Sequence, residues 1–193
     1  MLKVKVSAKS MRQPFHGCEP DYIKNVCHGR CCESSVNPRG IMVTIHASER
    51  HMIEAAGGRV DSDGFLHAEN KRCPFKTNDD LCGLHGTGSN QTTEIGNQQP
   101  FGCRASPFTL NKNDTLIVRN RYRLLKCYKD GDAPAYIAFK TSLIMLFGAI
   151  QYKKMATHLD EGGADIYLDM NVSIHEKLQT NDEAKRLARK RAS

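Results

Sequence analysis

Eight cysteines, all between residues 18 and 127 of this 193-residue chain, constrain its fold more than any other feature. Three of them occur within six positions, in the stretch "NVCHGRCCESS" (residues 25–35). The last third of the chain contains none. Thiols that served packing alone would be scattered along the chain. The distribution therefore predicts one cysteine-bearing module, with a supporting C-terminal part.

Disulfides, a redox thiol and a metal site are the three uses that compete for such a cluster. The N-terminal residues 1–15 contain no apolar run that could serve as a signal-peptide core. The most apolar stretch, residues 135–150, carries Lys140 and is shorter than the ~20 residues that span a bilayer. We therefore expect a soluble cytoplasmic protein without a membrane partner. In a reducing compartment, clustered cysteines favour metal binding or catalysis over structural disulfides.

Thiolate is a soft donor that suits zinc or an iron–sulfur cluster. Gly29 allows the backbone between the first cysteines to turn tightly. A disulfide between the neighbours Cys31 and Cys32 would be strained, so they predict two adjacent metals or one ligand with a spare. His85 follows Cys82 at a spacing that lets both reach one ion. The predicted ligands of one or two centres are Cys18, Cys27, Cys31, Cys32, Cys73, Cys82, His85, Cys103 and Cys127.

Taken in order, "CHGRCC" (27–32), "RCPF" (72–75), "LCGLH" (81–85) and "QPFGCRASPF" (99–108) resemble the YkgJ family of zinc- or iron-chelating domains, which has eight characteristic cysteines. The resemblance covers residues 14–128. It departs from the family at Gln99, where an arginine is usual, and in the longer polar stretch 86–98. The resemblance implies a metal or iron–sulfur centre held by these cysteines and a histidine, but no single reaction.

The sequence predicts an α+β fold, with a small metal-centred domain of short strands and helices over residues 1–130 and a helical extension over 131–193. Alternating or apolar runs predict strands at 2–8, 41–45, 64–68, 115–120 and 164–170. A short helix is expected over 47–58, capped by Ser48 and closed by Gly57. One long helix is expected from Pro134 to His158, and a basic helix or tail over 181–193.

The most favoured function is that of a metal-binding protein, and two alternatives stay open. A modification or redox enzyme could use the same centre, although the sequence identifies no catalytic residue and no substrate or protein partner. A zinc-stabilised nucleic-acid-binding module is the second alternative, although the formal charge of +7 is weak support for it, because thiolates around metal ions would lower that charge. Nucleic acid is not favoured, because no aromatic side chain for base stacking is interleaved with the basic residues 185–191. His28, His16 and His67 are weaker candidate ligands than His85.

Overall fold

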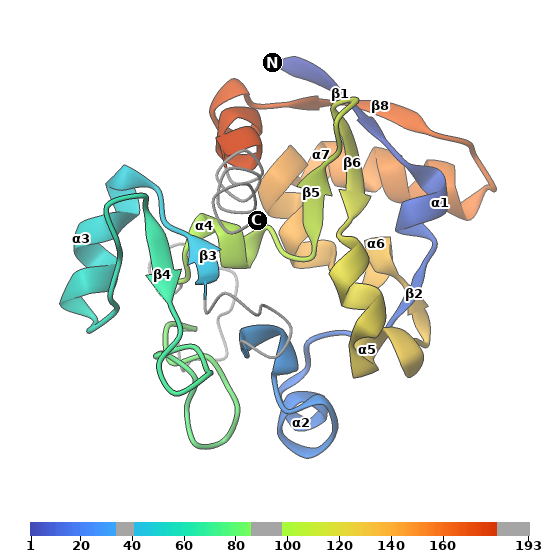
Figure 1. The fold of residues 1–193 in the computed structure, drawn as a ribbon. Helices are drawn as coiled ribbons and strands as arrows, with labels where there is room; N and C mark the ends of the chain where they lie inside the picture. The colour runs from blue at the N-terminus through green and yellow to red at the C-terminus, as the bar shows by residue number, and fades with distance from the viewer. Residues whose placement is uncertain (34–40, 86–97, 181–193) are drawn as a thin grey trace. The chain divides into compact units, whose positions relative to one another are not determined.

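A computed structural model of the chain describes residues 1–33, 41–85 and 98–180 (Figure 1). Its helices and strands form an α+β fold, as the sequence predicts. The contacts divide the chain into two compact units. Unit 1 comprises residues 1–18 and 104–193, and unit 2 comprises residues 19–103. The predicted division into residues 1–130 and 131–193 stays a prediction, and the predicted basic tail lies outside the described residues.

Unit 1 is built on a four-stranded mixed sheet with the strand order β5-β6-β1-β8 (Figure 1). Strand β1 (Leu2–Val6) pairs antiparallel with β8 (Ile166–Met170) and parallel with β6 (Thr115–Val118). Strand β5 (Phe108–Leu110) forms an antiparallel pair with β6. The strands predicted at 2–8, 115–120 and 164–170 are confirmed.

The alternating pattern of β1 explains its place in the sheet. Val4 and Val6 are fully buried, whereas the lysines between and beside them form ion pairs with β8 and the segment before it. Lys3 pairs with Asp169 at 2.9 Å and Lys5 with Asp165 at 3.0 Å. The buried side chains of β6 and β8 continue the same apolar face: Leu116, Val118, Leu168 and Met170.

Two helices replace the single long helix that the sequence predicts after Pro134. Helix α6 (Ala135–Ala138) ends at Phe139, whose φ and ψ of −117° and 35° are not helical, and α7 (Lys140–Asp160) follows. Helix α7 itself is interrupted at Gly148, where φ is +79°. Its C-cap is Glu161, so the helix extends slightly beyond the predicted end at His158. Leu143, Leu146 and Met155 bury its apolar face within unit 1.

Shorter elements complete unit 1. Strand β2 (Pro14–Phe15) pairs antiparallel with β7 (Ala133–Pro134). Helix α1 (Ala8–Met11) begins after Ser7, whose hydroxyl accepts a hydrogen bond from the Ser10 amide. The remaining elements are η4 (Asn120–Leu124), α5 (Lys126–Lys129) and a helical segment over residues 172–180. No helix in the described part of the chain is both long enough and apolar enough to cross a membrane.

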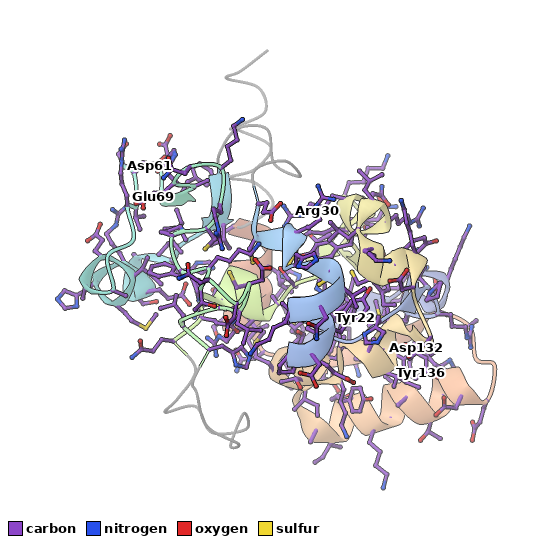
Figure 2. The ribbon with its side chains drawn as sticks, turned by 90° about the horizontal axis from the view of Figure 1, so that it is seen from below. Tyr22, Arg30, Asp61, Glu69, Asp132 and Tyr136 are labelled. Atoms are coloured by element: carbon purple, nitrogen blue, oxygen red, sulfur yellow. The ribbon has the colours of Figure 1, made fainter. Side chains whose placement is uncertain are left out.

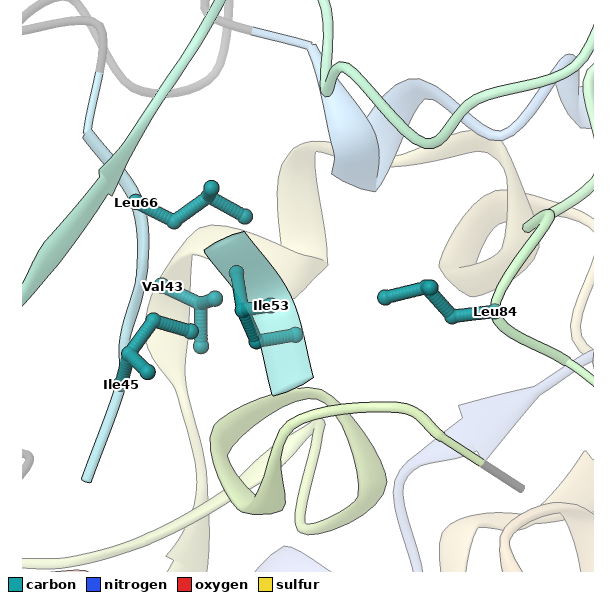
Figure 3. Close-up of a cluster of buried hydrophobic side chains, with 5 residues drawn as sticks. All are labelled: Val43, Ile45, Ile53, Leu66 and Leu84. Atoms are coloured by element: carbon teal, nitrogen blue, oxygen red, sulfur yellow. The ribbon is translucent and has the colours of Figure 1, made fainter. Parts of the chain in front are cut away.

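Unit 2 has a small core between a two-stranded hairpin and one helix. Strands β3 (Ile41–Thr44) and β4 (Phe65–His67) pair antiparallel, which confirms the two predicted strands. Helix α3 (Ala47–Ala55) directs Ile53 between the strand side chains and Leu84 (Figure 3). The five buried members of this core are Val43, Ile45, Ile53, Leu66 and Leu84. Three cysteines pack against the same core: Cys73, Cys82 and Cys103.

The N-cap of α3 differs from the prediction. His46, and not Ser48, is the N-cap residue, because the Glu49 carboxylate accepts a hydrogen bond from the His46 amide at 3.2 Å. The predicted closure is confirmed, since Gly57 has φ +91° and the Gly58 amide donates to the Ile53 carbonyl at 2.9 Å.

Candidate metal centre

Six of the eight cysteines lie in unit 2, and none of the eight, all of which are described, forms a disulfide. The six come from three separate regions of the chain: the loop with Cys27, Cys31 and Cys32, the turn that runs from Cys73 to Cys82, and the short helix with Cys103. The other two, Cys18 and Cys127, belong to unit 1.

The first loop turns sharply at two consecutive left-handed residues. The π-helical turn η1 (Ile23–Cys27) follows α2 (Pro20–Tyr22), and then His28 and Gly29 adopt φ values of +53° and +52°. The chain continues into the 3-10 turn η2 (Arg30–Cys32). In Figure 2, Tyr22 and Arg30 are labelled at the two ends of the segment that contains η1, His28 and Gly29. The predicted tight turn at Gly29 is confirmed, and it places three thiols within one short loop.

Two of the sulfurs accept a hydrogen bond from the amide two residues further along the chain. The Gly29 amide donates to Cys27, and the Phe75 amide donates to Cys73. Amide donors of this kind stabilise thiolates and orient them in metal and iron–sulfur sites. Burial nevertheless raises the pKa of the Cys27 thiol, so in the absence of a cation this thiol is neutral at pH 7.

The neighbouring thiols of Cys31 and Cys32 lie on the same side of the loop. Their sulfurs are 3.9 Å apart, well beyond the ~2.05 Å of a disulfide. The hydrogen bond and the charge of Cys31, followed by burial, raise the pKa of Cys32 well above its ordinary value. The charges of Cys103 and Cys73 add to this rise. The pKa of Cys32 therefore responds to thiols from all three segments.

The second segment is a narrow turn that brings its two cysteines together. Lys76 and Cys82 form an antiparallel bridge, and the Gly83 amide donates to the Phe75 carbonyl at 2.7 Å. Burial raises the pKa of the Cys73 thiol to about 11, against the hydrogen bond from Phe75, and the charges of Cys82 and Cys31 raise it further. The pKa values of Cys32 and Cys73 thus each depend on the charges of thiols in other segments.

The third segment is held in place by a buried carboxylate. Glu49 of α3 accepts a hydrogen bond from the Phe101 amide at 2.7 Å, at the start of α4 (Phe101–Arg104), which contains Cys103. The ring of His46 packs edge-on against the ring of Phe101, with 5.6 Å between the centroids. The sequence does not reveal this role of Glu49, because the two partners lie 52 residues apart.

A buried ion cluster lies between the first and second segments. Lys76 is 3% exposed, and its ammonium group contacts the carboxylates of Glu33 at 2.8 Å and Asp80 at 2.9 Å. Burial lowers the pKa of Lys76, but the hydrogen bonds to the two carboxylates outweigh burial and raise it. The hydrogen bond from Lys76 lowers the pKa of Asp80, against the effect of burial, and a hydrogen bond from His28 adds to the lowering. Lys76 and Asp80 are therefore charged at pH 7.

The sequence alone suggested no role for Lys76, because a lysine in a polar turn is ordinarily exposed. The only signal was its position four residues before Asp80, between two cysteines. Asp80 lies in the turn with a φ of +63°, a left-handed conformation that aspartate tolerates better than most residues.

The histidines have a different environment from the thiols. His28 lies 3.1 Å from a carboxylate oxygen of Asp80, and His67 lies 2.7 Å from a carboxylate oxygen of Asp61. His16 contacts the Gly17 carbonyl at 2.9 Å. The amide of His85 donates to the Cys82 carbonyl at 3.0 Å, which places this residue next to the thiol group. Its role as a ligand stays a prediction.

The remaining two cysteines, Cys18 and Cys127, lie in unit 1. The Cys127 carbonyl accepts a hydrogen bond from the His16 amide at 2.7 Å, which brings the chain near Cys127 close to the residues just before Cys18. Within unit 1 these two cysteines therefore lie on neighbouring segments. Their assignment to the same centre as the other six stays a prediction.

The candidate metal ligands among the described residues come from neighbouring segments, but they are not arranged around a single point. No group of three or more His, Cys, Asp or Glu side chains in residues 1–33, 41–85 and 98–180 has the geometry to hold a metal ion. The fit to a soft cation rests on the chemistry of the donor set, which comprises thiols outside disulfides with amide donors at two sulfurs. Closing a coordination shell would require the thiol side chains to reorient.

A comparison of the chain with protein-family models, with curated proteins and with solved structures finds no significant match in any of the three. The resemblance to the YkgJ family stays a prediction from the cysteine-bearing stretches.

Proposed function

We propose that unit 2 is a thiolate metal-binding module that takes zinc or an iron–sulfur cluster. The observation that carries the proposal is geometric: the Cys73 amide donates to the Cys32 carbonyl at 2.9 Å, the sulfurs of Cys31 and Cys32 lie 3.9 Å apart, and three further cysteine side chains, Cys73, Cys82 and Cys103, pack against one small core. Thiols gathered in this way would repel one another once ionised, whereas a soft cation would pair with each of them as thiolate. The proposed ligands are drawn from Cys27, Cys31, Cys32, Cys73, Cys82 and Cys103.

Four thiolates complete either kind of centre, because zinc takes four sulfurs tetrahedrally and a cubane cluster takes one sulfur per iron. Zinc would crosslink the three segments, and an iron–sulfur cluster would add one-electron chemistry. Other residues of the chain would orient the sulfur ligands. The amides of Gly29 and Phe75 orient two sulfurs, and Glu49 fixes the start of the helix that contains Cys103.

The raised pKa values of Cys27, Cys32 and Cys73 require the bound cation to displace protons from these thiols. A reducing compartment such as the cytoplasm would keep them free for binding. The alternatives of a metal-dependent enzyme and of a zinc-stabilised nucleic-acid-binding module would both build on the same centre, and both stay predictions.

The test is the metal content of the full chain, produced and purified without oxygen in medium that contains zinc and iron. The wild type is expected to retain zinc or iron in a fixed ratio to protein. The variants Cys32→Ser and Cys73→Ser should lose most of it, whereas Asp79→Ser should not. Asp79 is a suitable control because it lies in the same turn, and its side chain is 68% exposed. Wild-type protein without zinc or iron would overturn the proposal.

The variants Cys18→Ser and Cys127→Ser extend the same measurement to unit 1. Loss of metal in either variant would add that cysteine to the ligands. Unchanged metal content in both would restrict the centre to the thiols of unit 2.

A further inference from the structure

The Lys76 side chain joins the two segments that contain five of the six thiols of unit 2. Its ammonium group donates to the His28 carbonyl at 2.6 Å and to the Glu33 carboxylate at 2.8 Å. It also contacts the Asp80 carboxylate at 2.9 Å. His28 and Glu33 flank Cys31 and Cys32 in the sequence, while Lys76 and Asp80 lie between Cys73 and Cys82.

The two segments approach each other at backbone distance beside this ammonium group. A Cβ atom at Gly29 would lie 2.7 Å from the Asp80 carbonyl oxygen and 3.4 Å from Cε of Lys76. The Cys73 amide also donates to the Cys32 carbonyl at 2.9 Å. The loop of residues 27–33 therefore lies directly on the turn of residues 73–82, and Lys76 lies within this contact.

Burial of an ammonium group is costly unless hydrogen bonds and opposite charges compensate for it. Here three acceptors surround Lys76, and two of them are charged. An apolar side chain could fill the same volume, but it would attach neither the His28 carbonyl nor the two carboxylates. The directional contacts of Lys76 therefore fix the loop relative to the turn in a way that packing alone would not.

We infer that Lys76 is a positioning residue for the proposed metal centre, because it holds the Cys27–Cys32 loop on the Cys73–Cys82 turn. Thiols of both segments are then near one another before a cation arrives, and the cation orders fewer residues when it binds. This inference rests on the proposed function. In this inference Lys76 does not ligate the metal, but it contributes to the affinity of the site for the metal.

An oxygen-free titration with Co²⁺ under reducing conditions tests the inference, because thiolate-bound cobalt has absorption bands that report the number and geometry of its sulfur ligands. The proteins are the full-length wild type and the variants Lys76→Met, Asp80→Asn and Lys24→Met. Lys24→Met is the matched control. Lys24 lies just before the loop and pairs with Asp79 of the same turn at 3.3 Å, but its side chain is exposed.

We expect Lys76→Met to raise the Kd for Co²⁺ about 10- to 100-fold, the range found for outer-shell residues of metal sites. Its bands at saturation should also differ from those of the wild type. Asp80→Asn, which removes the negative charge from one of the three contacts, should shift the Kd in the same direction by a smaller factor. Lys24→Met should stay within about twofold of the wild type. If Lys76→Met does not fold, Asp80→Asn decides the matter.

A role of Lys76 in stability alone would lower the melting temperature but leave the Kd and the cobalt bands unchanged. Wild-type binding together with wild-type Kd and bands in Lys76→Met and Asp80→Asn would overturn this inference while the proposed function stands. A wild type that binds neither Co²⁺ nor Zn²⁺ would overturn both.

Discussion

The backbone amide of Cys73 donates a hydrogen bond to the carbonyl oxygen of Cys32, with an N···O distance of 2.9 Å. Two cysteines separated by 40 intervening residues are thus joined through their own main chains. The contact places the loop with Cys27, Cys31 and Cys32 beside the turn with Cys73 and Cys82. Predictions about the candidate centre follow from this contact and from the groups around it.

Removal of bound metal should destabilise the chain by more than the loss of a single core contact. Thiolates joined by a cation connect three segments of unit 2, and a structural metal contributes directly to the free energy of folding. The decrease should exceed the ~0.5–1.5 kcal/mol expected for Ile53→Val in the metal-bound protein. Thermal melting under reducing conditions, before and after a chelator, measures the effect. An unchanged melting temperature after verified demetallation would contradict the prediction.

Gly29→Ala should be more destabilising than Gly57→Ala. Both positions have positive φ, at +52° and +91°, so both substitutions introduce backbone strain. Only at Gly29 would the new Cβ also meet a backbone oxygen, that of Asp80 at 2.7 Å, whereas nothing lies within 4 Å at Gly57. We expect a difference of at least about 1 kcal/mol in the free energy of unfolding. Denaturant titration measures it, and equal losses would show that the loop is not held against the turn.

Glu49→Ala should cost about 1–3 kcal/mol of stability, because it leaves the amides of Phe101 and His46 without their acceptor. Glu54→Ala in the same helix is the control. Its exposed carboxylate pairs with Arg50 at 3.0 Å, a contact worth ~0.3–0.5 kcal/mol. The same denaturant titration compares them. A loss in Glu49→Ala no larger than that in Glu54→Ala would contradict the assigned anchor.

The carboxylate of Asp165 should make the stability of unit 1 depend on pH. The hydrogen bond from Lys5 lowers the pKa of Asp165, and the Ala8 amide lowers it further, against the effect of burial. A lowered pKa in the folded state stabilises the protein above the unfolded value of ~3.9, and this stabilisation is lost as the pH falls through the folded value. Asp165→Asn should therefore be less stable than the wild type at pH 7, by under about 1 kcal/mol because the ion pair is largely exposed.

The difference between Asp165→Asn and the wild type should shrink as the pH falls below ~3.9, and denaturant titrations at several pH values measure this. A difference that stays constant or grows in acid would contradict the assignment. Gln151→Ala is a useful comparison, because its amide contact to Asp169 at 3.3 Å does not involve Asp165.

Local sequence signals predicted most strands and the short helix of unit 2. Alternation of apolar and polar residues identified β1 and β8, and the apolar run over 41–45 identified β3. The parallel pairing of β1 with β6 could not be predicted, because residues more than 100 positions apart form it. The long helix after Pro134 was predicted without a break, since nothing in its composition shows that Phe139 and Gly148 leave the helical conformation.

The cysteine spacing predicted a shared metal site, but it did not predict which other residues hold the cysteine-bearing segments in place. The structure brings the Cys32 and Cys73 backbones within hydrogen-bond distance and packs Cys73, Cys82 and Cys103 against one core, whereas convergence of the thiols on a metal stays a prediction. Glu49 and Lys76 escaped notice because charged residues ordinarily lie at the surface, and only tertiary contacts bury them here. His46 replaced Ser48 as the N-cap of α3 because the Glu49 carboxylate accepts from its amide.

X-ray absorption at the zinc or iron edge, on full-length protein purified without oxygen, tests the central claim most directly. The account predicts a first coordination shell dominated by sulfur, at about 2.3 Å for zinc. The sulfur contribution should fall in Cys73→Ser, while Asp79→Ser should keep the wild-type spectrum. A first shell of nitrogen and oxygen alone, or a chain that retains no zinc or iron to measure, would contradict the account.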